Sequence, residues 1–319
     1  MKSFWRIPPI VVVLMILPAL AHAEWPERAL RFLEPYAPGT ALDAQVRHIA
    51  NELGPKLNVP IVVEHKAGAN GLIGTDAAAK AEPDGYTFLF TGPGHYTNEF
   101  LMTRITYDPL KDFKTVARLA SPMLALVVPA SSPFNSLPEL LAAARKDPGK
   151  LTYASGGSGS ASHLATADLL KKAKVEVLHV PYKTQAQAMT DTTSGQVDFT
   201  LTAIPTAVAQ LKAGRLKALA VTGSKRSATL PDLPTVAESG IEGYSFASFS
   251  GVFAPAATPD DIVRKFSALL ADEVRKPAFV EMTRVQGIDI DFADWKSWDP
   301  GAERRTWQEL VVTSGAKPE

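Results

Sequence analysis

The sequence predicts an α/β protein of two lobes, each built on a mainly parallel β-sheet flanked by helices. Short runs rich in β-branched and aromatic residues alternate with helical patterns of about ten residues. This alternation continues through most of the chain, which favours strands joined by helical crossovers. The 319 residues, of which 46% are hydrophobic and 21% charged, are enough to form two cores.

The N-terminal part of the chain supplies the first of these units. Leu42, Val46, Ile49 and Leu53 recur at spacings of four, three and four, so they share one face of a helix. We expect strands at 30–34, 61–64 and 87–91 and helices at 41–53 and 72–81.

The remainder of the chain continues the pattern and ends in helices. We expect strands at 124–128, 151–154, 175–179, 197–201 and 216–221. The helices between them are expected at 137–146, from the loop after 154 to 172, at 185–192 and at 206–213. The last sixty residues carry three helical segments, the final one at 303–314.

Two sheets require the chain to cross between lobes twice. The crossings are predicted near 120–129 and near 240–253, which makes the second lobe an insertion in the first. Lobe 1 then comprises 24–123 and 241–319, and lobe 2 comprises 124–240.

The first 23 residues have the parts of a secretory signal peptide. Lys2 and Arg6 precede an apolar run at 10–20, and Ala21-His22-Ala23 fits an A-x-A cleavage site. We therefore expect export and cleavage after Ala23. No later window is long and apolar enough to span a bilayer.

Composition excludes several kinds of site. The chain has no cysteine, which rules out thiolate metal and redox centres, and its net charge of zero does not suggest a nucleic-acid partner. The histidines are scattered, without an H-E-x-x-H or H-x-H pattern. We expect no metal and no cofactor.

Two loops rich in small residues each precede a predicted helix: EPYAPGTALD at 34–43 and ASGGSGSASH at 154–163. Small residues allow a ligand to approach the backbone closely, and the N–H groups at a helix start favour an anion. Ser155, Ser158 and Ser160 add hydroxyl donors. Such loops bind carboxylates as well as phosphates, whereas a purely structural alternative is helix capping.

The second loop fails the enzyme motifs that it superficially suggests. No lysine follows Gly157 or Gly159 as a P-loop requires, Ser162 replaces the third glycine of a dinucleotide fingerprint, and the loop lacks G-x-S-x-G. His163 is expected to pack or bond locally rather than act as a base. A hydrolase using Ser158 or Ser160 remains a weaker alternative, and we predict that the protein is not an enzyme.

Eight stretches of the chain resemble the Bug-type substrate-binding proteins of tripartite tricarboxylate transporters. They cover nearly the whole chain after the signal peptide and are APGTALD (37–43), EHKAGANGLIGTDAAAKAEPDGYT (64–87), YDPLKDF (107–113), YASGGSGSASHLA (153–165), HVPYK (179–183), SGQVDF (194–199), AGRLKALAVTGSKRSATLPDLPTVAESG (213–240) and FAPAATP (253–259). The resemblance implies a periplasmic, monomeric receptor with a class II periplasmic-binding fold. It also implies a small organic acid as ligand and membrane permease subunits as partners.

The resemblance further implies that the two loops hold a carboxylate from opposite sides of a cleft. Residues 37–40 and 155–160 would then supply backbone and hydroxyl donors. The full set of ligand-binding residues expected on this basis is Tyr36, Ala37, Pro38, Gly39, Thr40, Asp43, His95, Tyr96, Ser155, Gly157, Ser158, Gly159, Ser160, Thr202 and Phe249.

Four positions depart from the family pattern and leave the ligand's identity open. Glu34 replaces an apolar residue, Gly39-Thr40 replaces Gly-Gly, Thr202 replaces an aspartate that can meet a ligand amine, and Phe249 replaces a tryptophan. Glu34 either pairs with a nearby cation or water, or faces the cleft and selects the ligand. A sensor of the same fold that acts in signalling is the alternative to a transport receptor.

Overall fold

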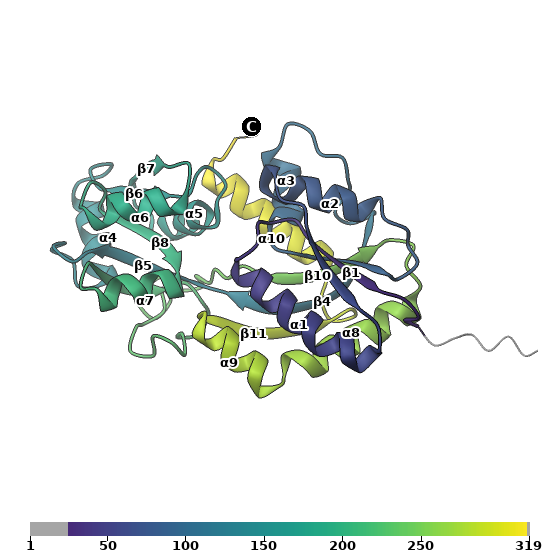
Figure 1. Cartoon of the computed structure of the whole chain (residues 1–319). Helices are drawn as coiled ribbons and strands as arrows, with labels where there is room; N and C mark the ends of the chain where they lie inside the picture. Colours follow the sequence, from purple (N-terminus) through teal and green to yellow (C-terminus); the bar gives the residue numbers. More distant parts are fainter. Residues whose placement is uncertain (1–24, 318–319) are drawn as a thin grey trace, which may run out of the picture.

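The computed structural model describes residues 25–317, so the predicted signal peptide lies outside the described residues. The described chain forms two α/β lobes that lie side by side (Figure 1). Within residues 25–317, no helix combines the length and the apolar character needed to cross a membrane.

Lobe 1 is built on a six-stranded sheet with the strand order β11-β4-β10-β3-β1-β2. Its strands are β1 (Leu30–Glu34), β2 (Ile61–His65), β3 (Thr87–Thr91), β4 (Phe113–Pro122), β10 (Ser250–Pro255) and β11 (Ile288–Asp294). Its helices are α1 (Ala41–Leu57), the 3₁₀ turn η1 (Ala69–Gly71), α2 (Leu72–Ala79), α3 (Gly94–Leu101), α8 (Asp260–Val274), α9 (Pro277–Val285) and α10 (Pro300–Ser314).

Lobe 2 is built on a five-stranded sheet with the strand order β7-β6-β8-β5-β9. Its strands are β5 (Leu124–Pro129), β6 (Thr152–Ser155), β7 (Leu178–Pro181), β8 (Phe199–Ala203) and β9 (Leu216–Val221). Its helices are α4 (Leu137–Lys146), α5 (Ala161–Ala173), α6 (Gln185–Thr193) and α7 (Ile204–Lys212).

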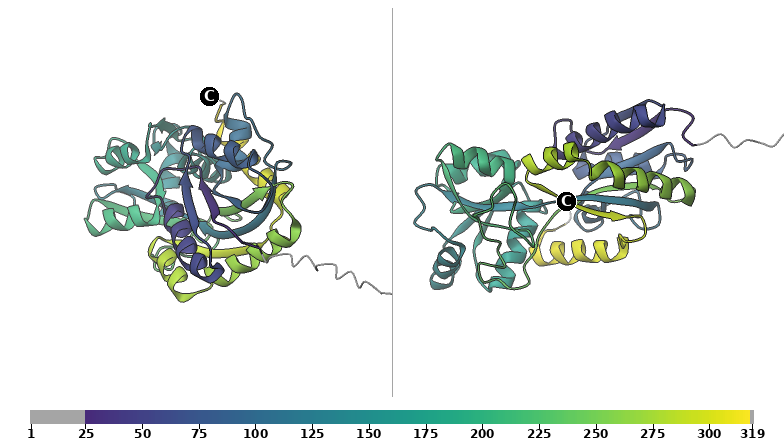
Figure 2. Two further views of the ribbon diagram at one scale, coloured as in Figure 1. Left: turned by 45° about the vertical axis from the view of Figure 1, so that its right-hand side comes forward. Right: turned by 90° about the horizontal axis from the view of Figure 1, so that it is seen from below.

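The chain crosses between lobes with almost no linker on the outward path. β4 ends at Pro122 and β5 begins at Leu124, and the crossing segment runs straight from one lobe to the other (Figure 2). The return path from β9 leads into β10 of the first sheet. The strands of each sheet fall within the segments expected for its lobe, while the exact lobe boundaries stay a prediction.

The predicted fold of two α/β lobes, each with a sheet flanked by helices, is confirmed, although both sheets are mixed rather than mainly parallel. β1, β2 and β3 pair in parallel, but β10 pairs antiparallel with β3 and β4, and β11 pairs antiparallel with β4. In lobe 2, β5 is antiparallel to β8 and β9. The chain leaves lobe 1 on β4 and returns to it on β10, so these two strands run in opposite directions. Antiparallel neighbours need no helical crossover between them.

The elements that the sequence did not predict are α3, β4, β10, β11 and the 3₁₀ turn η1. α3 begins at a glycine and has no side-chain cap, and β4 carries Lys114 and Arg118 among its apolar residues. Both features weaken the local signals on which prediction depends. The predicted apolar face of α1 is confirmed, since Leu42, Val46, Ile49 and Leu53 are all buried.

The two lobes also touch through the C-terminal helix. α10 packs against α3 of lobe 1 and against α5 of lobe 2. Lys171 Nζ donates to Thr313 Oγ1 at 3.1 Å, and Tyr244 Oη donates to the carbonyl of Ala165 at 3.0 Å. α5, which follows the second loop, therefore contacts α10 and the segment that returns to lobe 1.

Candidate functional site

The first loop leads from β1 into α1, and residues 37–40 are all exposed. Thr40 is the N-cap of α1: its backbone is extended and its Oγ1 accepts from the N–H of Asp43 at 3.1 Å. Gly39 donates its N–H to Asp43 Oδ2 at 2.7 Å. The N–H groups of Ala41 and Leu42 have no acceptor in the described chain, so the helix start is available to an anion.

A buried polar network supports this loop from below. Thr40 Oγ1 donates to Glu34 Oε1 at 3.2 Å, and Arg47 Nε lies 2.7 Å from Asp43 Oδ1. Glu34 has no exposed surface, so its carboxyl group does not face the cleft. Burial, with a further contribution from the charge of Asp43, raises the pKa of Glu34 to about 7.

The second loop leads from β6 into α5, and Ser160 caps that helix by accepting from the N–H of His163 at 3.3 Å. Several of its backbone N–H groups are already used: Gly156 donates to Ser162 Oγ, Gly157 to Ser155 Oγ and Gly159 to His163 Nδ1. The N–H groups of Ser158 and Ala161 have no acceptor among residues 25–317, and Ser158 is exposed.

Two stacked histidines hold the second loop in shape. The ring centroids of His163 and His179 are 4.0 Å apart, and the ring of Tyr153 stacks with that of His179 at 4.7 Å. His179 Nε2 lies 2.7 Å from Ser155 Oγ. Burial lowers the pKa of His163, and burial together with the neighbouring His163 lowers the pKa of His179 to about 4. The prediction that His163 bonds locally is confirmed by its bond to Gly159.

The pair of Ser155 and His179 does not form a nucleophilic centre. Ser155 is fully buried, and no carboxylate of the described residues hydrogen-bonds to His179. Ser160 uses its hydroxyl oxygen as a helix cap. The arrangement stabilises a loop conformation and offers no activated nucleophile.

A groove of about 410 Å³ separates the second loop from lobe 1. Lobe 2 contributes Gly156, Ser158, Gly159 and Ser160, and the lobe 1 side is formed by Ala69, Asn70, Leu101 and Met102, with Lys317 near the C-terminus. The walls are close together, since a Cβ atom on Gly159 would lie 2.5 Å from Leu101 Cδ1. The groove is large enough for a small organic molecule.

The sequence had not indicated that residues of the lobe 1 wall could contact a ligand. Asn70 is held by Asn98 of α3, through Asn70 Nδ2 to Asn98 Oδ1 at 2.9 Å and Asn98 Nδ2 to Asn70 O at 3.2 Å. Asn70 has a left-handed backbone, and Gly68 and Gly71 beside it also have positive φ. The G-A-N-G run was the signal for this turn.

The remaining predicted site residues lie in the protein interior. His95, Tyr96 and Phe249 are buried in an aromatic cluster, where His95 stacks on Phe253 at 4.1 Å and Phe249 contacts Trp298 at 5.4 Å. Burial lowers the pKa of His95 to about 3, so this imidazole is neutral. The structure does not bring these three side chains to the exposed loops.

Three further predicted residues take intermediate or buried positions. Tyr36 is partly buried, and its Oη lies 3.4 Å from Thr91 Oγ1. Asp43 is buried in the network under the first loop. Thr202 is buried on β8, and its hydroxyl has no hydrogen-bond partner in the part of the chain that the structure describes.

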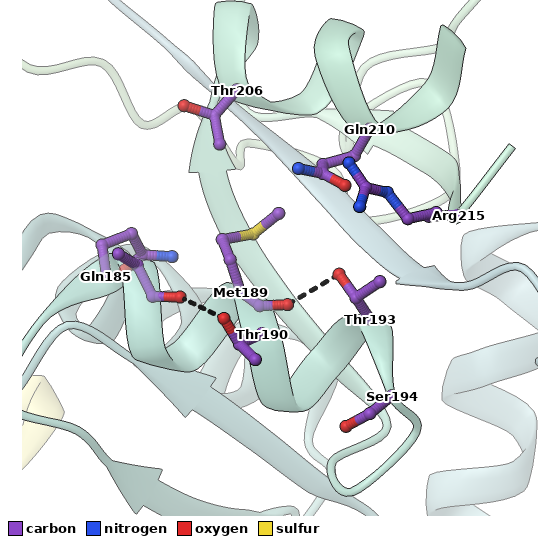
Figure 3. Close-up of a pocket in the computed structure, with 9 residues that line it drawn as sticks. Gln185, Met189, Thr190, Thr193, Ser194, Thr206, Gln210 and Arg215 are labelled. Carbon is purple, nitrogen blue, oxygen red and sulfur yellow. Dashed lines mark hydrogen bonds between the residues drawn. The ribbon is translucent and has the colours of Figure 1, made fainter. Parts of the chain in front are cut away.

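A larger cavity, of about 570 Å³, lies between α6 and α7 and belongs to lobe 2 alone. Figure 3 shows Gln210 and Arg215 directed toward α6, above Met189. Neither donor-rich loop lines this cavity. Size alone does not mark a binding site. The smaller groove lies between the two lobes and is lined by the second loop, so we take it as the candidate site; residues 37–40 of the first loop do not line it.

The fold and the groove define the class of protein. Two mixed α/β lobes joined by crossover strands are the architecture of periplasmic binding proteins. Residues 45–298 match the model of the tripartite tricarboxylate transporter family receptors, TctC. The chain belongs to this family, whose members and whose fold are those of solute-binding receptors rather than enzymes.

Curated relatives cover almost all of the chain. A protein in the tcbD-tcbE intergenic region of Pseudomonas sp. is 37% identical over 296 residues, covering 90% of this chain and 87% of that protein. BugT of Bordetella pertussis is 31% identical over 297 residues, covering 92% and 91%. The chain is therefore a Bug-type, TctC-like protein, as its motifs predicted.

Two solved structures that resemble this protein contain carboxylates. A Rhodopseudomonas palustris protein with adipate has a TM-score of 0.79 and 32% identity, covering 93% of this chain and 100% of that chain. MatC from the same species, with bound malate, has a TM-score of 0.70 and 28% identity, covering 91% and 98%. Both ligands are small dicarboxylic acids.

Proposed function

We propose that this protein captures a small organic carboxylate between its two lobes and delivers it to the membrane permease subunits of a tripartite tricarboxylate-type transporter. It acts as a monomeric receptor in the periplasm, after cleavage of the signal peptide behind Ala23. The family match, and the carboxylates bound to related proteins, support this proposal.

The observation that carries the proposal is the pair of exposed helix starts. α1 and α5 each begin at a hydroxyl N-cap, and each presents N–H groups that no acceptor of residues 25–317 uses. A carboxylate placed between them accepts hydrogen bonds from both lobes and benefits from both helix dipoles. We infer that the two loops close on the ligand as the two sides of a clamp.

A thermal-shift screen of organic acids, beginning with adipate and malate, tests the proposal. A ligand at a hundred times its dissociation constant adds about 2.7 kcal/mol of stability, which raises the melting temperature measurably. The acids must bind more tightly than their amides, because a neutral amide gains less from the helix starts. Amides that bind as tightly as the acids contradict the clamp.

The buried positions of Glu34 and Thr202 bear on the choice of acid. Neither side chain offers a carboxylate to an ammonium group in the cleft, since Glu34 has no exposed surface and Thr202 is uncharged. A buried ammonium without a counter-charge is costly to desolvate. We propose that acids without an α-amino group bind more tightly than their amino analogues. Paired titrations of malate and aspartate measure this preference, and tighter binding of aspartate refutes it.

A further inference from the structure

The hydroxyl group of Thr40 is shared between the helix cap and a buried carboxyl group. Its oxygen accepts from Asp43 N, and its single hydrogen points to Glu34 Oε1 at 3.2 Å. An ionised Glu34 can only accept hydrogen bonds, so it holds that hydrogen. Thr40 is exposed at the helix start, but in this state its hydroxyl has no hydrogen left to donate to a ligand.

Glu34 lies in a pocket that offers it little stabilising charge. Its Oε2 is buried and has no hydrogen-bond partner in the described residues. On α1, the charge of Arg47 is directed to Asp43, at 2.7 Å. On β2, His65 Nδ1 lies 3.9 Å from Glu34 Oε2 but 3.1 Å from the carbonyl oxygen of Tyr36.

His65 has partners that lie nearer to it than Glu34 does. Nδ1 donates to the carbonyl of Tyr36 at 3.1 Å, and Nε2 lies 3.0 Å from Arg47 Nη2 and 3.3 Å from Asp43 Oδ1. The other titratable groups facing Glu34 are Asp43, whose charge repels it, and the phenol of Tyr36.

We propose that Glu34 is a positioning residue whose protonation is linked to ligand binding. The protonated carboxyl group donates a hydrogen bond to Thr40, which frees the Thr40 hydroxyl to donate to the ligand carboxylate. Ligand binding is therefore accompanied by the uptake of a proton. The hydroxyl oxygen has two lone pairs, one for Asp43 N–H and one for the Glu34 O–H. Protonation also removes a negative charge from beneath the first loop, where the ligand carboxylate is to bind. The inference rests on the proposed function, because it assumes that the first loop binds a carboxylate.

The pH dependence of binding follows from the state of Glu34. Its pKa of about 7 means that most molecules are competent at pH 6 and roughly one in ten at pH 8. The dissociation constant for adipate or malate is therefore expected to rise about tenfold between pH 6 and pH 8. Titration calorimetry at pH 8 compares the binding enthalpy in two buffers of different ionisation enthalpy, phosphate and Tris. The difference between the two enthalpies is expected to correspond to uptake of about one proton per ligand.

Glu34→Gln supplies the decisive variant. Its amide N–H₂ donates permanently to Thr40, so binding at pH 8 is expected to match that of the wild type at pH 6, without proton uptake. Thr40→Ser keeps the hydroxyl and the pH dependence, whereas Thr40→Val loses both the donor and the proton uptake. Thermal unfolding at pH 8 shows whether each variant folds, and Glu34→Gln is expected to be the more stable protein there, because it buries no charge.

Glu273→Gln is the matched control. Glu273, on α8, is also a buried carboxylate of lobe 1, but it pairs with His48 of α1 and with Lys276, which precedes α9, outside both loops. This variant is expected to keep the wild-type pH dependence of binding. The inference is overturned if the wild-type protein binds the acid without proton uptake, or if Glu34→Gln keeps the pH dependence of binding. In either case the proposed function still stands. If no acid of the screen binds at any pH, the proposed function itself is wrong.

Discussion

Replacing Gly159 with alanine tests whether the close contact between the second loop and lobe 1 matters for binding. Gly159 has φ +75, and an added Cβ would lie 2.5 Å from Leu101 Cδ1. An L-residue with left-handed backbone costs about 1–2 kcal/mol. Because carbon atoms pack best at about 3.5–4.0 Å, the loop or Leu101 must also move by roughly 1 Å.

Gly149→Ala is the control for the backbone strain. Gly149 has nearly the same φ, +71, but an added Cβ would meet no atom within 4 Å. Urea unfolding is expected to show a loss of about 1–2 kcal/mol in both variants. Only Gly159→Ala is expected to raise the dissociation constant for the acid, by at least tenfold or about 1.4 kcal/mol.

A second substitution separates the contact from the strain. Leu101→Ala in the Gly159→Ala background removes the atoms that the new Cβ would strike, so the dissociation constant is expected to return toward the wild-type value. The double variant is expected to be less stable, by about 2–5 kcal/mol, because Leu101 is buried. If Gly159→Ala binds the acid as tightly as Gly149→Ala does, the groove is not the ligand site and the reasoning fails.

Three further predictions concern processing, motion and acid stability. Mass spectrometry of the exported protein is expected to show a mature chain that begins at Glu24, and an intact Met1 would contradict the cleavage site. Small-angle scattering is expected to show contraction at saturating ligand, because each lobe holds only half of the donors; an unchanged radius of gyration would mean that the site is already closed. The free energy of unfolding is expected to fall from pH 6.5 towards pH 4, because His179, with its pKa of about 4, stays neutral in the folded state while the unfolded chain takes up a proton. A variant with His179→Gln is expected to lose less stability over that range, and equal losses would exclude His179 as the cause.

The sequence by itself determined the features that depend on neighbouring residues. The strands at Leu30–Glu34 and Thr87–Thr91 and the helix at Leu137–Lys146 have the predicted bounds, because alternation and helical spacing are local patterns. Thr40 and Ser160 cap the helices that follow them, as hydroxyl residues at a helix start do. The two donor-rich loops can therefore be recognised from residue types and spacing alone.

Tertiary structure decided which side chains meet across long stretches of sequence. The pairing of Glu34 with Thr40 is short-range, but the burial that raises the pKa of Glu34 depends on β2 and α1 packing over it. The stacking of His163 on His179 and the approach of Leu101 to Gly159 likewise join elements that are distant in the chain. Residue types indicate which groups can donate a hydrogen bond or ionise, whereas packing sets their desolvation and their contacts. The raised pKa of Glu34 could therefore be inferred only from the folded chain.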